Sequence, residues 1–297
     1  MSETHDIQTR FLLPAAGVRG VAVDLLESWQ QVQAHARYPH QARSLLGQSC
    51  AAAALFTGHA KVNGRLSLQL RSQQALRTLF AECTAQGTLR GIVRLAESAD
   101  APADLRELGE QAMLAITIEN PGLDPREPQR YQSLVSLEAP TLDAALESYF
   151  VQSEQLPTRL LLAADGARAA GIMLQKLPGD EGDTDGWDRA GALFNTLRPD
   201  ELLGTPTSTL LKRLFQQEEV AILADRPLRF GCSCSRARVS AMLQTLGEDE
   251  ARAAVQGDAP AEVRCEFCGH SYLFELPEIE ELFVRPAVEL PAPDRLQ

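Results

Sequence analysis

The sequence predicts an α+β fold, in which a mixed, mainly antiparallel sheet domain is followed by a helical linker and a small cysteine-containing domain. Three observations predict this organisation. Short runs that alternate apolar and polar residues are interspersed with a few helical patterns up to Leu177. An acidic run without apolar residues follows Pro178, and four of the six cysteines lie in the last quarter of the chain. The expected parts are residues 1–178, 179–226 and 227–297.

Composition limits the classes of protein and partner. The chain has 297 residues, a formal charge of −12 and 44% hydrophobic residues, which is ample apolar material for a core. An excess of acidic residues disfavours binding to nucleic acid or to anionic membranes, because no net positive field releases counterions. The first residues lack the pattern of a signal peptide, and no apolar run is long enough to span a bilayer. We therefore expect a soluble, intracellular protein.

The first elements follow from residue periodicity and from residues that break helices. Residues 9–13 and 18–25 are expected to be strands joined by a turn, and residues 64–71 alternate leucines with polar neighbours at period two. Helices are expected at residues 27–37 and 41–56, since Pro39 ends the first and the second is rich in alanine. Further strands are expected at residues 76–83, 89–95, 113–119 and 131–137.

The sheet domain is expected to end with a helix and a hairpin. Residues 142–150 have a helical pattern with Thr141 near the N-cap. Strands at residues 159–164 and 168–177 flank Asp165 and Gly166, a pair that favours a positive-φ hairpin turn.

The linker is expected to begin with a solvated acidic segment, residues 179–186, and to continue as helices at residues 187–197 and 208–217. Glu181, Asp183 and Asp185 match the first positions of a calcium loop, but Ala192 stands where a bidentate Glu is required, which excludes calcium. The apolar faces of the helices must cover the sheet domain or be exposed. Their residues are Trp187, Leu193, Phe194, Leu197, Leu211, Leu214 and Phe215.

The cysteines of the last quarter have the spacing of a metal site. Cys232 and Cys234 are separated by one residue, Cys265 and Cys268 by two, and thirty residues lie between the pairs. Zn²⁺ binds four thiolates tetrahedrally, and Gly231 and Gly269 allow the tight turns that such loops need. We therefore expect one Zn²⁺ per chain, bound by Cys232, Cys234, Cys265 and Cys268. His270 is an alternative ligand, although four thiolates already complete the tetrahedron.

The spacing leaves the role of this zinc open. A purely structural site is one interpretation. Reversible oxidation is the other, because a disulfide across one intervening residue is strained and comparatively reducible, and a disulfide sulfur is a poor metal ligand. Cys50 and Cys83 lie alone in patterns typical of a core and are expected to be buried structural thiols. Common short motifs of enzymes, such as G-x-S-x-G or a Walker-type loop, do not occur.

Taken together, these residues resemble the redox-regulated 33-kilodalton heat-shock chaperone family of bacteria (33 kDa chaperonin), over nearly the whole chain. One departure is that Ala170 precedes a single Gly171, where relatives often have two glycines. The matching segments are residues 230–235 with Arg238, 246–248, 263–269 with Tyr272 and Phe274, 131–135, 149–158 and 170–178.

The resemblance implies a non-enzymatic, ATP-independent holdase of the oxidative stress response in the cytoplasm. It implies that the reduced, zinc-bound form is inactive and that oxidants form the disulfides Cys232–Cys234 and Cys265–Cys268. Zinc then leaves, the C-terminal region unfolds, the linker loosens, and the protein binds unfolding clients and forms a homodimer.

Elementary energetics agrees with that order of events. Structural zinc contributes about 10–16 kcal/mol to the folding of small thiolate domains, and a domain of roughly 70 residues has a limited core of its own. The alternative function is a zinc-ribbon protein with a non-redox role, such as a nucleic-acid-modifying enzyme, which the charge of −12 disfavours.

Overall fold

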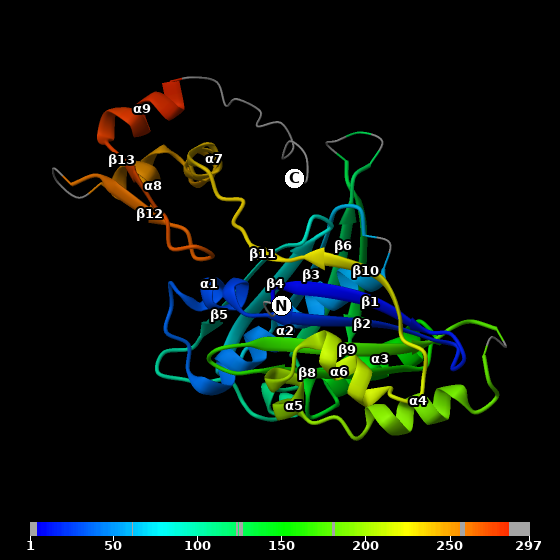
Figure 1. Ribbon diagram of the computed structural model, residues 1–297. Helices are drawn as coiled ribbons and strands as arrows, with labels where there is room; N and C mark the ends of the chain where they lie inside the picture. Colours follow the sequence, from blue (N-terminus) through cyan, green and yellow to red (C-terminus); the bar gives the residue numbers. More distant parts are fainter. Residues whose placement is uncertain are drawn as a thin grey trace.

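The computed structural model describes residues 5–60, 62–122, 124, 127–179, 182–255 and 259–284. Two sheets enclose a long central helix, three linker helices lie against one sheet, and a small C-terminal unit lies beside this body (Figure 1). The arrangement confirms the predicted α+β class with mainly antiparallel sheets. No helix of the described residues is long and apolar enough to cross a membrane.

The first sheet has five strands in the order β10-β1-β2-β9-β8, and every neighbouring pair is antiparallel. Its outer and inner faces are both covered, so β2 and β9 are buried along almost their whole length. The strands are β1 (Ile7–Leu13), β2 (Val18–Leu25), β8 (Thr158–Ala164), β9 (Ala169–Lys176) and β10 (Ala221–Pro227).

The second sheet has six strands in the order β11-β5-β4-β3-β6-β7. Its pairs are antiparallel except that β11 runs parallel to β5. In β3 the predicted alternation is confirmed, since Leu66, Leu68 and Leu70 are buried and the residues between them are half-buried. The strands are β3 (Arg65–Arg71), β4 (Leu76–Thr84), β5 (Thr88–Leu95), β6 (Met113–Asn120), β7 (Gln129–Val135) and β11 (Arg229–Phe230).

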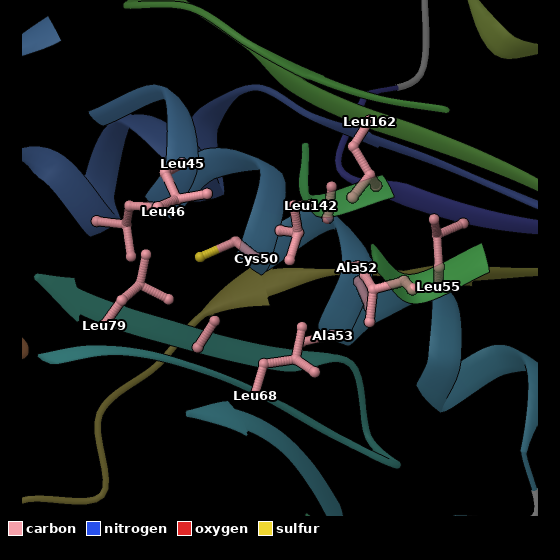
Figure 2. Packing of buried hydrophobic residues seen from close by; sticks show 14 of the residues in the cluster. Leu45, Leu46, Cys50, Ala52, Ala53, Leu55, Leu68, Leu79, Leu142 and Leu162 are labelled. Carbon is pink, nitrogen blue, oxygen red and sulfur yellow. The ribbon is translucent and has the colours of Figure 1, made fainter. Parts of the chain in front are cut away.

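Helix α2 (His40–His59) runs between the two sheets and contacts strands of both. Its run of four alanines, residues 51–54, is fully buried, and these small side chains let both sheets approach the helix closely. Figure 2 shows this packing, with Leu68 and Leu79 of the six-stranded sheet on one side of the helix and Leu162 of β8 on another. The flanking helices are α1 (Glu27–Gln33), the 3-10 helix η1 (Leu105–Leu108) and α3 (Leu142–Ser153).

Both isolated cysteines lie in this core, as predicted. Cys50 of α2 is 1% exposed and Cys83 of β4 is 0% exposed. Burial raises the pKa of Cys50 far above its usual value and raises the pKa of Cys83 to about 11. Both sulfurs are therefore inert, protonated thiols at neutral pH.

The linker helices α4 (Gly186–Phe194), α5 (Pro199–Gly204) and α6 (Thr207–Leu214) cover the outer face of the five-stranded sheet, as predicted. The ring of Phe215, just after α6, is 0% exposed and lies 6.2 Å from the ring of Phe11 in β1. This interface forms a second hydrophobic cluster, separate from the one around α2. Its buried members include Phe11, Leu13, Val18, Ile172, Leu174, Phe194, Leu197, Leu202, Leu210, Leu211 and Phe215.

Two local expectations are wrong, and two others are confirmed with added detail. The linker is not helical to its end, because strand β10 lies there and pairs with β1. Helix α5, in the middle of the linker, was not predicted. The described part of the acidic segment is solvated, as expected, because Asp183 and Asp185 are exposed, and both form ion pairs with Arg189. Neither Asp165 nor Gly166 has a positive φ; instead the Asp165 carboxylate accepts hydrogen bonds from the backbone of the next residues and closes the turn. Thr141 is the N-cap residue of α3, as expected, although its hydroxyl donates to Asp143 and makes no capping hydrogen bond.

The C-terminal unit has a small core of its own. Its buried residues are few, and several exposed large side chains, such as Met242 and Leu246, surround them. The core residues are Val239, Leu243, Ala251, Ala261, Phe274 and Ile279. The elements are α7 (Arg236–Leu246), α8 (Glu248–Ala253), β12 (Ala261–Arg264), β13 (Ser271–Phe274) and α9 (Leu276–Val284).

Candidate metal centre

Four cysteine side chains from two loops converge in the C-terminal unit. Cys232 and Cys234 lie between β11 and α7, and Cys265 and Cys268 lie in the turn of the β12–β13 hairpin. All four ligand sulfurs lie within 4.8 Å of one another, and all four are free thiols. The structure therefore brings together the four residues that the spacing had singled out.

The separations between the sulfurs match a tetrahedral four-thiolate site. The Sγ atoms of Cys232 and Cys265 are 3.6 Å apart, and those of Cys234 and Cys268 are 3.4 Å apart. A metal with ligand distances of about 2.3 Å holds its sulfurs about 3.8 Å from one another. The cluster of ligand atoms in the described residues contains these cysteines and no histidine, and the ring of His270 packs against Tyr272 instead.

The second loop is shaped by backbone hydrogen bonds around its cysteines. The amide of Cys265 donates to the carbonyl of His270 at 2.9 Å, and the amide of Gly269 donates to the carbonyl of Cys265 at 2.8 Å. Gly269 has φ +71°, a conformation that disfavours side chains, and an added Cβ would lie 2.9 Å from the Cβ of His35. This position therefore requires glycine for both conformation and space.

The first loop is held at both ends. Before Cys232, the amide of Gly231 donates to the carbonyl of Leu89 at 3.0 Å and extends the pairing of β11 with β5. After Cys234, the hydroxyl of Ser235 caps α7 by accepting from the amide of Arg238. The guanidinium of Arg238 donates back to the carbonyl and hydroxyl of Ser233, which lies between the two cysteines. The loop is thereby fixed with its sulfurs toward the second loop.

The thiols differ in their electrostatic surroundings. Burial raises the pKa of Cys232 to about 12 and also raises that of Cys268. Burial acts in the same direction on Cys234, but hydrogen bonds from the Tyr272 hydroxyl, at 3.2 Å, and from the neighbouring thiols outweigh it and lower its pKa. A thiolate is the form that binds metal, so Tyr272 supports the ligand form of Cys234 from outside the cluster.

The metal loops also contact the six-stranded sheet. The ring of Phe267, between Cys265 and Cys268, packs edge-on against Phe80 at 5.7 Å, and the guanidinium of Arg90 lies 4.5 Å above it. Arg94 forms an ion pair with Glu266, and Arg90 donates to the hydroxyl of Ser233 at 2.8 Å. No pattern in the sequence predicts these contacts between distant segments. The one available signal was an aromatic residue between two metal ligands, where a polar residue would suffice.

Comparisons with known proteins agree with this geometry. The profile of a family described as "Hsp33 protein" matches residues 6–275. The 33 kDa chaperonin of Azotobacter vinelandii is 42% identical over 285 residues, covering 94% of each chain. The 33 kDa chaperonin of Ectopseudomonas mendocina is 42% identical over 299 residues, covering 98% of this chain and 99% of the relative.

A solved structure shares the fold. The crystal structure of the 33 kDa chaperonin from Thermotoga maritima superposes with a TM-score of 0.75 at 20% identity and covers 95% of this chain and 98% of the other. The similarity extends over both sheets, the linker helices and the C-terminal unit, so the whole architecture is one that occurs in a known chaperonin.

Proposed function

This chain belongs to the Hsp33 family, a family of chaperones and not of enzymes, and we propose that it is a redox-regulated, ATP-independent holdase. In this proposal the reduced form is inactive, and the oxidised form binds unfolding proteins and prevents their aggregation in the cytoplasm. The observation that carries it is the cluster of four free thiols within 4.8 Å, in a unit with a small core.

The metal of the reduced form is Zn²⁺, one per chain, held by Cys232, Cys234, Cys265 and Cys268. Zn²⁺ has no redox chemistry of its own and accepts four thiolates tetrahedrally, so it joins the two loops into one folded unit. The donor set supports this choice, because it offers four sulfurs within 4.8 Å of one another and no oxygen ligand among the described residues.

Oxidation forms the disulfides Cys232–Cys234 and Cys265–Cys268. Each disulfide removes two electrons from its sulfurs, and hydrogen peroxide takes them up with two protons to give two molecules of water. In the reduced geometry close separations also join the two loops, 3.6 Å between Cys232 and Cys265 and 3.4 Å between Cys234 and Cys268. Peptide mapping of the oxidised protein distinguishes the proposed pairing within each loop from this pairing between loops.

Loss of zinc then unfolds residues 227–297, the proposed redox-switch domain. In its described residues, six buried side chains form the core, which is too little apolar area to hold a unit of this size without the metal. Unfolding also removes the contacts of Phe267, Glu266 and Ser233 with the six-stranded sheet. The proposed linker, residues 179–226, thereby loses its neighbour on the C-terminal side.

Release of the linker exposes apolar surface on two sides at once. The outer face of the five-stranded sheet, including Phe11 and Ile172, is buried only because α4, α5 and α6 lie on it. The apolar faces of the same helices become exposed with it. Client proteins bind to these apolar surfaces, and the proposed chaperone core, residues 1–178, is the part that holds them. The oxidised form associates as a homodimer. The proposal includes no nucleic-acid or membrane partner.

The test measures zinc content, free thiols and chaperone activity before and after peroxide treatment. The expected result is one zinc per reduced chain, loss of that zinc with loss of four thiols, and suppression of client aggregation only after oxidation. If the protein keeps its zinc under peroxide and retains nucleic acid on a column, the zinc-ribbon alternative holds and the redox switch is excluded.

A further inference from the structure

Three arginines lie in a diagonal row across one face of the five-stranded sheet. The register pairs Gln8 with Arg226 across β1 and β10, and Leu12 with Arg19 across β1 and β2. Gln8, Arg10 and Leu12 share a face of β1, because successive side chains alternate. Gln8 donates to the carbonyl of Ala54, so this face is the one turned toward α2. Arg226, Arg10 and Arg19 therefore occupy neighbouring positions at the C-terminal end of that helix.

None of these three guanidinium groups has a carboxylate partner in the described part of the chain. Arg19 donates to Gln175 and lies 3.4 Å from the ring nitrogen of His59. One terminal nitrogen of Arg226 donates to the carbonyl of Ala85 at 2.8 Å, while its Nε and Nη2 atoms are buried without a hydrogen-bond partner. Arg10 has no ion pair among the described residues. These donors of Arg226 do not line the cavity described below, which is lined by Arg10 and Arg19 instead.

The local field is correspondingly positive. Burial, then Arg19 and Arg10, lower the pKa of His59 to about 4, so the imidazole adds no charge at neutral pH. Burial, and to a smaller extent the charge of Arg10, lowers the pKa of Arg19. The carbonyl end of α2 contributes only about half an elementary negative charge, which cannot neutralise three guanidinium groups.

A cavity opens beside this row. Its volume is about 150 Å³, and its lining includes Arg10, Arg19, Gly58, His59 and Met173. No described acidic side chain lines it. We propose that this cavity binds a small tetrahedral oxyanion of the size and charge of inorganic phosphate. Guanidinium groups suit such an anion because their planar N–H pairs donate to two oxygens at once.

The anion would also stabilise the end of the linker. Arg10 lies on β1, which pairs with β10, and Arg10 repels Arg226 on that strand. An anion at Arg10 and Arg19 offsets this repulsion and holds β10 against β1. Strand β10 continues directly into β11 and the loop of Cys232, so the bound anion favours the docked conformation. The binding itself does not depend on the chaperone proposal.

The test is calorimetric titration of the reduced, zinc-loaded full chain with sodium phosphate, against sodium chloride at equal ionic strength. The expected result is saturable binding of one phosphate per chain, with none for chloride. Arg10→Gln should weaken phosphate binding at least tenfold. Arg213→Gln, which removes the same charge from an exposed position of α6, should leave the affinity within twofold of the parent.

Phosphate also stabilises proteins nonspecifically through exclusion from their surface, and the two variants separate that effect from binding. Hydrogen exchange of β10 amides should slow in phosphate for the parent and for Arg213→Gln, and should not change for Arg10→Gln. The proposal is overturned if no saturable heat is found, or if both variants respond to phosphate alike. Circular dichroism and zinc content confirm that Arg10→Gln is folded, as expected for an exposed side chain.

Discussion

The ring of Phe267 packs edge-on against the ring of Phe80, with their centroids 5.7 Å apart. Phe267 lies between two cysteines of the metal centre, and Phe80 lies in the middle of β4. The turn that carries Cys265 and Cys268 is thus also a part of the C-terminal unit that contacts the six-stranded sheet. Any change of backbone between Cys265 and Cys268 moves this aromatic contact directly.

Loosening that contact should lower the threshold for activation. Phe267→Ala removes an aromatic pair and a cation–π contact, together worth about 1–2 kcal/mol. We expect normal zinc content, faster hydrogen exchange in the C-terminal unit and activation at lower peroxide. Leu273→Ala, at an exposed position of β13, is the control. Equal exchange rates in both variants would show that the contact does not hold the unit in place.

Removal of one ligand should abolish metal binding. Cys265→Ser replaces a thiolate with a hydroxyl, a much weaker zinc ligand, and we expect far less than one zinc per chain. The C-terminal unit should then exchange its amides rapidly while both sheets stay protected, as measured by mass spectrometry. A variant that binds zinc as tightly as the parent would contradict the four-cysteine assignment.

The two core thiols should be dispensable for activation. Cys50 and Cys83 are buried, and their pKa values lie above the usual range, so oxidants reach them slowly as protonated thiols. The double variant Cys50→Ala, Cys83→Ala should lose about 1–3 kcal/mol of stability and still be activated by peroxide. Loss of the peroxide response in a variant that remains folded would refute this assignment.

A charge in the linker interface should activate the protein without oxidation. Phe215 is fully buried against Phe11. Phe215→Glu should therefore lower the free energy of unfolding by more than ~3–5 kcal/mol, the usual effect of Phe→Ala in a core. We expect aggregation suppression in the reduced state with zinc still bound. Lys212→Glu, exposed on the same helix, should stay inactive. If Phe215→Glu is folded and inactive, burial of this face does not control activity.

His59 should make stability depend on pH in acid. Its pKa falls from about 6.5 in the unfolded chain to about 4 in the folded protein, first through burial and then through Arg19 and Arg10. The unfolded state therefore binds the extra proton between these values, and stability falls as pH decreases from 6.5 to 4, by roughly 3 kcal/mol. Titration of the His59 ring by NMR measures the pKa directly. His59→Gln should flatten the pH dependence of urea unfolding in this window, and an unshifted pKa would contradict the prediction.

The metal site could be predicted from the sequence because the type and spacing of its residues identify the ligands. Two close cysteine pairs with glycines beside them suffice to specify four ligands, whatever the fold around them. Strand β3 and helix α2 could also be predicted from the sequence. Alternating leucines indicate the strand, and a run of alanines favours the helix. The spacing left reversible oxidation open beside a purely structural role, and only the resemblance implied the disulfide pairing and the switch in activity.

The tertiary structure alone decided which surfaces meet. The hydroxyl of Thr9 donates to Asp225 across 216 residues of sequence, and this contact belongs to a strand, β10, that local pattern did not reveal. The row of Arg226, Arg10 and Arg19 exists only in the register of three strands, and Phe267 meets Phe80 only after the C-terminal unit has docked. The periodicity of apolar residues predicts which face of a helix or strand is buried. Contacts between distant segments depend instead on the complementary shape and charge of two surfaces, which exist only once the chain has folded.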